Sequence, residues 1–143
     1  EPGELDQDMI NSARFLKAHE LSSGQLGSTG FCWGGGMTNR LAAVLGSDLQ
    51  AGVPFYGASV SAGDVASIEA AIMINYADTD PRINSMWPDY EAALDANNVN
   101  YTMHIYEGTL HGFHNNSTPR YNKPAADLAW NRTVGFFREH LAS

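Results

Sequence analysis

Short apolar segments suited to β-strands alternate with segments of helical periodicity along this chain, and no other feature limits its possible folds as much. The candidate strands are residues 25–31, 51–56, 71–76 and 101–106. Between them, apolar residues recur at the spacing of amphipathic helices. This alternation predicts an α/β fold with a mainly parallel sheet of about four strands, flanked by helices on both faces.

The predicted helices are recognised by their apolar faces and by the residues at their ends. Gly46 is well placed to end the helix that follows residue 31, and residues 57–63, rich in Gly and Ser, predict a loop. Asn84 or Ser85 can cap the next helix, with Pro88 in its first turn. The residues that repeat at helical spacing are Leu5, Met9, Ala13 and Leu16; Met37, Leu41, Val44 and Leu45; Met86, Tyr90, Ala93 and Leu94; and Ala126, Trp130, Val134 and Phe137.

Length and composition predict a single domain over residues 1–143 and exclude several classes of partner. Hydrophobic residues make up 43% of the chain, which is enough for a buried core. The net charge of −8 argues against nucleic acid and acidic membrane surfaces. A single cysteine excludes an internal disulfide, and no apolar run approaches the roughly 20 residues of a membrane span. We expect neither nucleic acid nor membrane as a partner and take the cytoplasm as the default location.

A pattern associated with nucleophilic catalysis follows the first predicted strand. Gly30-Phe31-Cys32-Trp33-Gly34 matches the nucleophile-elbow pattern G-x-S-x-G with cysteine in place of serine. Gly30 and Gly34 should let strand and helix approach closely, and the helix N-terminus should lower the thiol pKa. The N–H of Trp33 should point to where an oxyanion forms. The alternative is a buried structural cysteine, which the strand and helix on either side disfavour.

Candidate acids and bases follow the later strands. Asp78 and Asp80 come after the third strand, and either carboxylate can orient a histidine, although such residues also cap turns before proline. His111 follows the fourth strand, where a general base belongs. His111 and His114 lie three residues apart, but no third ligand has suitable spacing, so we expect neither metal nor cofactor. The order nucleophile, acid, histidine is that of α/β-hydrolases.

Four segments together resemble dienelactone hydrolases, also called carboxymethylenebutenolidases. These are the elbow from Gly30 to Gly36, Val53-Pro54-Phe55-Tyr56-Gly57, the acid loop from Tyr76 to Asn84, and the histidine loop from Tyr106 to Asn116. The resemblance implies an α/β-hydrolase fold of which this chain is the C-terminal, catalytic portion, with Cys32, Asp80 rather than Asp78, and His111 as its triad. In that family, earlier residues supply the first half of an eight-stranded sheet and a second oxyanion-hole N–H.

The function predicted from these residues is hydrolysis of a carboxylic ester or lactone through a thioester on Cys32. A serine esterase is excluded, since no serine occupies the elbow. Founding dienelactone hydrolases carry an arginine four residues after the histidine, whereas this chain has Asn115, so we expect a substrate other than dienelactone itself. The alternative is a catalytically weak, truncated homologue that acts as a binding or assembly module.

The strand that carries Cys32 also predicts self-association. A chain that begins at Glu1 would leave this strand at the edge of the sheet, where unpaired backbone groups can bind another chain. Residues 25–31 contain no proline and no charge that would block such pairing. We therefore expect a homodimer, or association with an N-terminal fragment, through the exposed edge.

Overall fold

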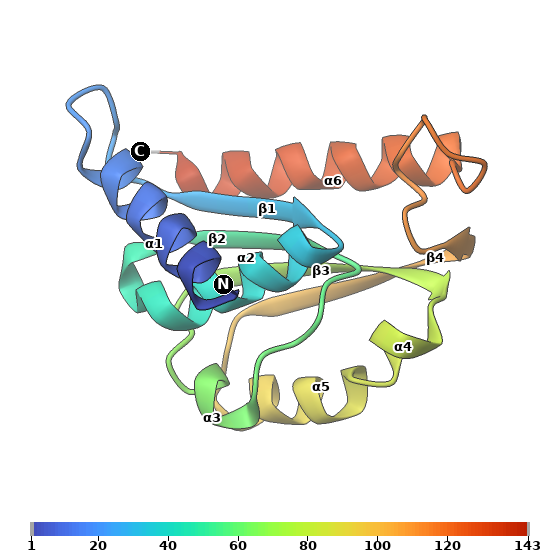
Figure 1. Cartoon of the computed structure of the whole chain (residues 1–143), viewed down its shortest axis with the longest axis horizontal. Coiled ribbons are helices and arrows are strands. Elements are labelled where there is room, and N and C mark those ends of the chain that lie inside the picture. The colour runs from blue at the N-terminus through green and yellow to red at the C-terminus, as the bar shows by residue number, and fades with distance from the viewer. Residues whose placement is uncertain (1, 143) are drawn as a thin grey trace.

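Four parallel strands form a single sheet in the order β1-β2-β3-β4, in a computed structural model that describes residues 2–142 (Figure 1). The strands are β1 (Gly27–Phe31), β2 (Ala51–Phe55), β3 (Ala71–Thr79) and β4 (Tyr101–Leu110). The predicted α/β class, parallel sheet and four strands are confirmed. Because all strands run in one direction, their carboxyl ends meet at one edge of the sheet, where α/β proteins place their chemistry.

Helices cover both faces of this sheet. They are α1 (Pro2–Ala18), α2 (Trp33–Leu45), α3 (Ala62–Val65), α4 (Pro81–Asn84), α5 (Trp87–Ala96) and α6 (Lys123–Leu141), with a short 3₁₀ helix at Gly46–Asp48. The end of α2 at Gly46 is confirmed, since this residue has a φ of 50°. Within the described residues, no helix is long and apolar enough to cross a membrane.

The structure differs from the sequence prediction between the strands. Part of the predicted loop forms α3, whose N-terminus is capped by the Ser61 side chain. The cap of α5 is Met86, because Asn84 and Ser85 belong to the preceding short helix α4 and its C-terminal end. Asp80 starts α4 by accepting a hydrogen bond from the N–H of Ile83, and this extra turn shifts α5 along the chain.

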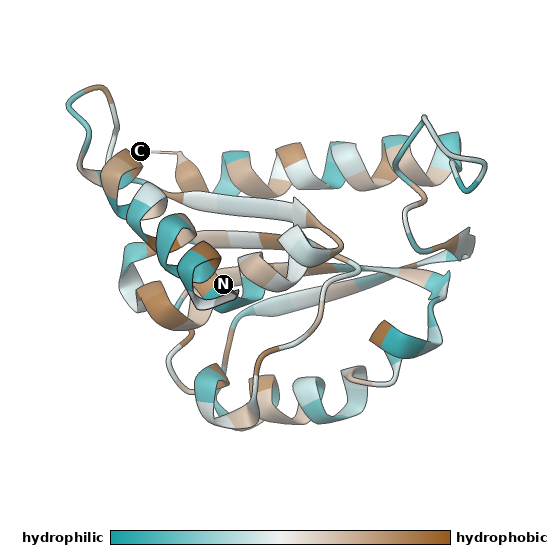
Figure 2. Cartoon of the chain, viewed as in Figure 1, coloured by the Kyte–Doolittle hydropathy of each residue, from teal (hydrophilic) through white to brown (hydrophobic). Residues whose placement is uncertain are grey.

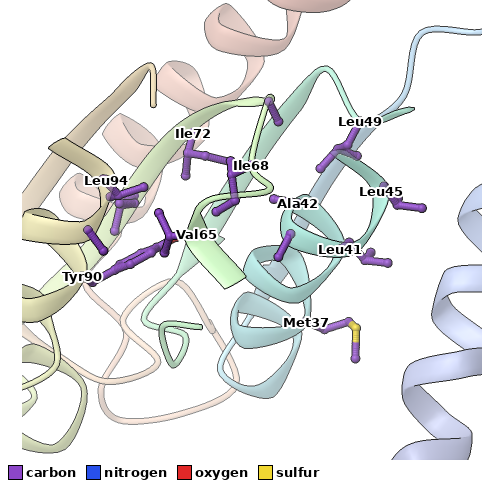
Figure 3. Close-up of a cluster of buried hydrophobic side chains, with 14 of the residues drawn as sticks. Met37, Leu41, Ala42, Leu45, Leu49, Val65, Ile68, Ile72, Tyr90 and Leu94 are labelled. Atoms are coloured by element: carbon purple, nitrogen blue, oxygen red, sulfur yellow. The ribbon is translucent and has the colours of Figure 1, made fainter. Parts of the chain in front are cut away.

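Two apolar clusters, one on each face of the sheet, hold the layers together. The larger cluster joins β3 to α1, α2, α3 and α5, and Figure 3 shows part of it. The smaller cluster joins β2, β3 and β4 to α6 through Val53, Phe55, Met73 and Ala129. The alternation of side chains along β3 feeds both clusters: Ile72 and Ile74 lie in the larger one, and Met73 in the smaller. Burial on both faces explains the continuous apolar run in this strand.

Helix α6 leaves apolar surface exposed at one side of the sheet. The buried positions of α6 are Ala129 and Thr133, whereas Trp130 is 53% exposed although the sequence placed it on the apolar face. Hydrophobic residues, drawn brown, recur along α6 and α1 (Figure 2). Strand β1 lies at the edge of the four strands that the structure describes.

Candidate active site

Cys32 lies in a strained turn between β1 and α2. Its φ is 56° and its ψ is −117°, which is a region that residues with a side chain rarely adopt. Two hydrogen bonds hold the turn: the Cys32 N–H donates to the carbonyl of Phe55 (3.1 Å), and the Gly36 N–H donates to the carbonyl of Cys32 (3.1 Å). The Cys32 side chain is exposed in this turn.

Glycines make the turn possible, although not all of those predicted. A Cβ atom added to Gly30 would lie 2.2 Å from the carbonyl oxygen of Gly34, so the predicted close approach is confirmed at Gly30. An added Cβ at Gly34 would meet nothing within 4 Å, so the prediction is wrong there. The tight positions on the helix side are instead Gly35 and Gly57, whose added Cβ atoms would lie 2.4 Å from the Phe55 carbonyl oxygen and 2.2 Å from the Gly35 carbonyl carbon, respectively.

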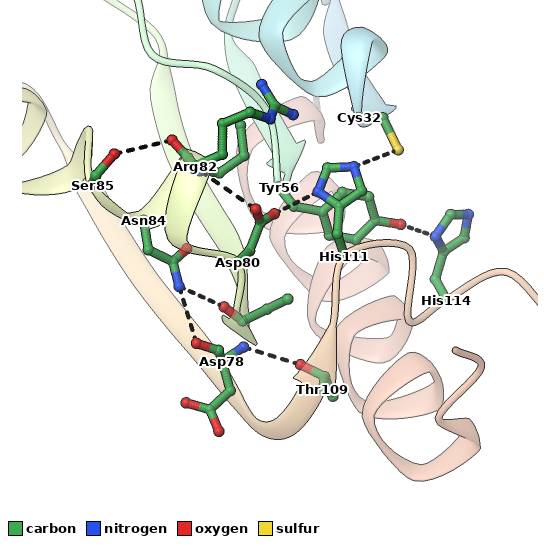
Figure 4. A network of polar contacts seen from close by, with 12 residues as sticks. Cys32, Tyr56, Asp78, Asp80, Arg82, Asn84, Ser85, Thr109, His111 and His114 are labelled. Atoms are coloured by element: carbon green, nitrogen blue, oxygen red, sulfur yellow. Dashed lines mark hydrogen bonds and ion pairs between the residues drawn. The ribbon is translucent and has the colours of Figure 1, made fainter. Parts of the chain in front are cut away.

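Cys32, His111 and Asp80 are in contact through consecutive hydrogen bonds (Figure 4). Nε2 of His111 lies 3.0 Å from Sγ of Cys32, and Nδ1 of His111 lies 2.5 Å from Oδ2 of Asp80. The three residues come from the carboxyl ends of β1, β3 and β4. One imidazole ring thus bridges a thiol and a carboxylate, the geometry in which a histidine can take a proton from a nucleophile while an acid orients it.

The two candidate acids have different contacts. Asp80 is 6% exposed and reaches His111. Asp78 lies within β3, which runs three residues further than predicted, and its exposed carboxylate accepts a hydrogen bond from the N–H of Gly108 (3.0 Å). Since Gly108 has a φ of 70°, this bond holds an irregular turn in β4, where the pairing of β3 and β4 shifts register. Asp78 therefore supports the strand that leads to His111 and does not contact the ring.

The electrostatics of Cys32 differ from the prediction. Burial raises the pKa of the Cys32 thiol, and the negative charge of Asp80 acts in the same direction. Arg120 and Arg82 lower this pKa but do not offset the burial. The expected lowering of the thiol pKa is therefore wrong for the free site, because loss of hydration penalises the thiolate more than nearby positive charge stabilises it.

Trp33 and an open cavity lie next to Cys32. Trp33 is the first residue of α2, so its N–H has no partner within the helix and is available to a developing oxyanion. Its side chain, 58% exposed, lines an open cavity of about 480 Å³. Other residues around this cavity include Cys32, Met37, Arg40, Val60 and Arg82. The cavity combines apolar and charged walls, which suits a small polar substrate.

Three neighbours of the site were not singled out from the sequence as site residues. Arg82 lines the cavity beside Cys32 and, with Arg120, brings positive charge to the thiol. Tyr56 is fully buried, and its ring lies 4.6 Å from that of His111. Both Tyr56 and Arg82 lie just after the end of a strand, so the rule that located Cys32 and His111 also applies to them.

A parallel sheet with a nucleophile elbow at the carboxyl end of one strand defines the α/β-hydrolase class. Residues 2–141 match the model of the dienelactone hydrolase family, and the chain belongs to this family. It is 34% identical over 138 residues to a Saccharolobus solfataricus protein assigned as a carboxymethylenebutenolidase, covering 93% of this chain and 52% of the relative. It is 32% identical, over an alignment of 148 positions with gaps, to a Bradyrhizobium protein assigned as a 2-oxo-3-(5-oxofuran-2-ylidene)propanoate lactonase. This alignment covers 94% of this chain and 59% of the relative.

Solved structures share the fold. A crystal structure from Klebsiella pneumoniae, assigned as a dienelactone hydrolase, superposes with a TM-score of 0.84 at 24% identity, covering 96% of this chain and 61% of its own. The chain therefore spans about half to three fifths of the length of these relatives.

Proposed function

We propose that this chain hydrolyses a carboxylic ester or lactone, with Cys32 as nucleophile, His111 as general base and Asp80 as the residue that orients His111. The observation that carries the proposal is the hydrogen-bonded sequence from Sγ of Cys32 through both ring nitrogens of His111 to Asp80. Family membership supports the reaction class. No metal or cofactor is needed for this chemistry.

The proposed reaction starts from a neutral thiol. As Sγ of Cys32 attacks the carbonyl carbon, its proton moves to Nε2 of His111, and Asp80 stabilises the resulting imidazolium. The carbonyl oxygen becomes an oxyanion near the N–H of Trp33. Collapse of this intermediate breaks the bond to the alcohol oxygen, which takes the proton from His111 and leaves a thioester on Cys32. Water, deprotonated by His111, then attacks the thioester. The C–S bond breaks, the acid leaves, and the sulfur of Cys32 takes the proton back from His111.

A series of short p-nitrophenyl esters and simple lactones tests the reaction class directly. We expect release of product together with a transient mass increase of one acyl group on the peptide that contains Cys32. The alternative function is a binding or assembly module with weak catalysis, and the short length relative to its relatives is the observation that favours it. The alternative, a binding or assembly module, would be supported by folded protein that hydrolyses none of these compounds and is acylated by none of them.

The pH dependence of thiol alkylation tests the proposed resting state. Because burial raises the pKa of Cys32, iodoacetamide should label it slowly at neutral pH, with a midpoint above the ordinary thiol value of about 8.5. Arg120→Gln should move the midpoint to still higher pH, because a positive charge that stabilises the thiolate is lost. Arg138→Gln, at an exposed position in the last turn of α6, is the control and should leave the midpoint unchanged. A midpoint below 8 in the parent protein would contradict a neutral resting thiol.

We also propose that the exposed edge of β1 pairs with a second copy of the chain. An added Cβ at Gly27 would lie 2.8 Å from Leu141 and Phe137, so the apolar side of α6 adjoins this edge. That side lines open grooves with Trp130 and Val134. Antiparallel pairing of β1 about a two-fold axis would place α6 against α6 of the other copy, apolar surface against apolar surface.

Light scattering after size exclusion at micromolar concentration measures this association. We expect a dimer that Trp130→Glu weakens, whereas Leu128→Glu, on the other side of α6, does not. Both side chains are about half exposed, at 53% and 46%, so the two variants form a matched pair. A single species near 15.5 kDa that does not change with concentration would rule out association through this edge.

A further inference from the structure

Tyr56 occupies a position that is unusual for a tyrosine. It follows the last residue of β2, is fully buried, and has a φ of 34°, in the left-handed region. Its N–H donates to the carbonyl of Asn75 in β3, with an N···O distance of 2.7 Å. Strained residues of this kind persist where the surrounding structure fixes them, and they cluster at functional sites. Cys32 is another non-glycine residue with positive φ, so two of them adjoin the same site.

The side chain of Tyr56 contacts both histidines of the loop after β4 (Figure 4). Its ring lies 4.6 Å from the ring of His111, at an interplanar angle of 53°. Its hydroxyl group is hydrogen bonded to Nδ1 of His114. His114 in turn stacks on Phe31, the last residue of β1, with ring centroids 3.7 Å apart and an interplanar angle of 11°. Tyr56 therefore connects the histidine loop to the strand that carries the nucleophile.

The protonation states of this pair follow from its burial. Burial raises the pKa of Tyr56 well above its ordinary value; Cys32 adds to the effect and Arg120 opposes it. Burial also lowers the pKa of His114. The Tyr56 hydroxyl thus remains protonated, and it can donate to Nδ1 of His114 in the tautomer that carries its proton on Nε2. On the α6 side, Tyr121 and Asp127 share a small cavity with His114, and Asp127 is paired with Lys123.

We infer that Tyr56 and His114 are positioning residues that hold the ring of His111 in line between Cys32 and Asp80. The inference rests on the proposed role of His111 as the general base. The bonds to Asp80 and Cys32 fix the two ring nitrogens but leave the ring free to rotate about the line between them. The Tyr56 ring, 4.6 Å away, restricts this rotation, and the hydrogen bond between its hydroxyl and His114 fixes Tyr56 itself.

The same contact stabilises the charge that forms during the reaction. His111 becomes an imidazolium when it takes the proton of Cys32, and a cation within about 6 Å of an aromatic centroid is attracted to the ring. Donation of the hydroxyl proton to His114 increases the electron density on the Tyr56 ring and strengthens this attraction. The spacing of His111 and His114 thus has a role that does not involve a metal.

Each of two variants removes the hydrogen bond between the Tyr56 hydroxyl and His114, one variant at each partner. Tyr56→Phe keeps the ring that faces His111, and His114→Phe keeps the stacking on Phe31. Each should lower kcat roughly 2- to 12-fold, the range that corresponds to one net hydrogen bond, with KM unchanged. The double variant should lose no more than either single variant, because both remove the same bond. Tyr76→Phe is the matched control and should keep parent activity, because the buried Tyr76 hydroxyl has no hydrogen-bond partner among residues 2–142.

A measurement without turnover separates this inference from the proposed function. In ¹⁵N NMR spectra, the parent His111 should show one tautomer with the proton on Nδ1, facing Asp80. Tyr56→Phe and His114→Phe should broaden or shift these signals, whereas Tyr76→Phe should not. A parent that hydrolyses no ester would contradict the proposed function, while the NMR comparison would still decide the support of His111. Unchanged kcat together with unchanged His111 signals in folded Tyr56→Phe would overturn the inference, as would additive losses in the double variant.

Discussion

Cys32→Ala is expected to abolish ester hydrolysis while leaving the chain folded. Loss of the nucleophile from a triad that acts as a unit lowers kcat by about 10⁴-fold or more. The variant should fold, because alanine removes one sulfur atom from an exposed turn and keeps the same backbone strain at φ 56°. Turnover of an ester that the parent hydrolyses, measured together with the melting temperature, checks both statements.

The matched control for Cys32→Ala is Ala58→Gly. It removes a single methyl group from the wall of the cavity beside Cys32 and leaves the triad unchanged. This variant should retain most of the parent activity. If Cys32→Ala hydrolyses the ester at the parent rate, the assignment of the nucleophile is wrong. If Cys32→Ala unfolds, Cys32→Ser is the second variant. It places a hydroxyl group where the thiol was and should fold with strongly reduced turnover.

Asp80→Asn should damage activity far more than Asp78→Asn. An asparagine at 80 can still cap α4, since asparagine is as good an N-cap as aspartate, so the fold should survive. Its neutral amide no longer stabilises the imidazolium and can favour the wrong tautomer of His111, which in a comparable triad costs about 10⁴-fold in kcat. At position 78 the amide oxygen can still accept the bond from Gly108, so only a few-fold loss is expected.

Steady-state kinetics of the two variants on one ester, with the pH profile of kcat, make the comparison. Because the substitutions are chemically identical and lie two residues apart, general effects of charge removal are similar in both. Equal losses of kcat in the two variants, or a larger loss at position 78, would contradict the assignment of Asp80 as the acid.

Much of the architecture could be read from the sequence because local physical rules govern it. The apolar strands, the helical spacing after residue 31 and the end of α2 at Gly46 depend on periodicity and on the conformational freedom of glycine. The turn that carries Cys32 could also be predicted, because Gly30 has to lack a side chain for the strand and the helix to meet.

Two features that depend on contacts between distant segments were not predicted correctly. The cap of α5 moved because Asp80 started an extra turn, α4, ahead of it. The pKa of Cys32 shifts in the opposite direction from the prediction, because burial by the assembled loops outweighs positive charge. Neither the depth of burial nor the position of Arg120 relative to the thiol can be obtained from spacing along the chain.

The candidate site shows the same division. The sequence by itself determined which residue types follow each strand, and hence that Cys32, an aspartate and His111 would meet at one edge of a parallel sheet. The residue pattern left Asp78 and Asp80 open, and the family resemblance chose Asp80. Only the tertiary structure decided that Asp78 binds the N–H of Gly108 and that Tyr56 contacts both His111 and His114. The physical reason is that local patterns set the alternation of strands and helices, and with it the parallel direction of the strands. A hydrogen bond between residues 31 positions apart depends instead on the register and length of β3 and β4, which form only when the whole sheet is packed.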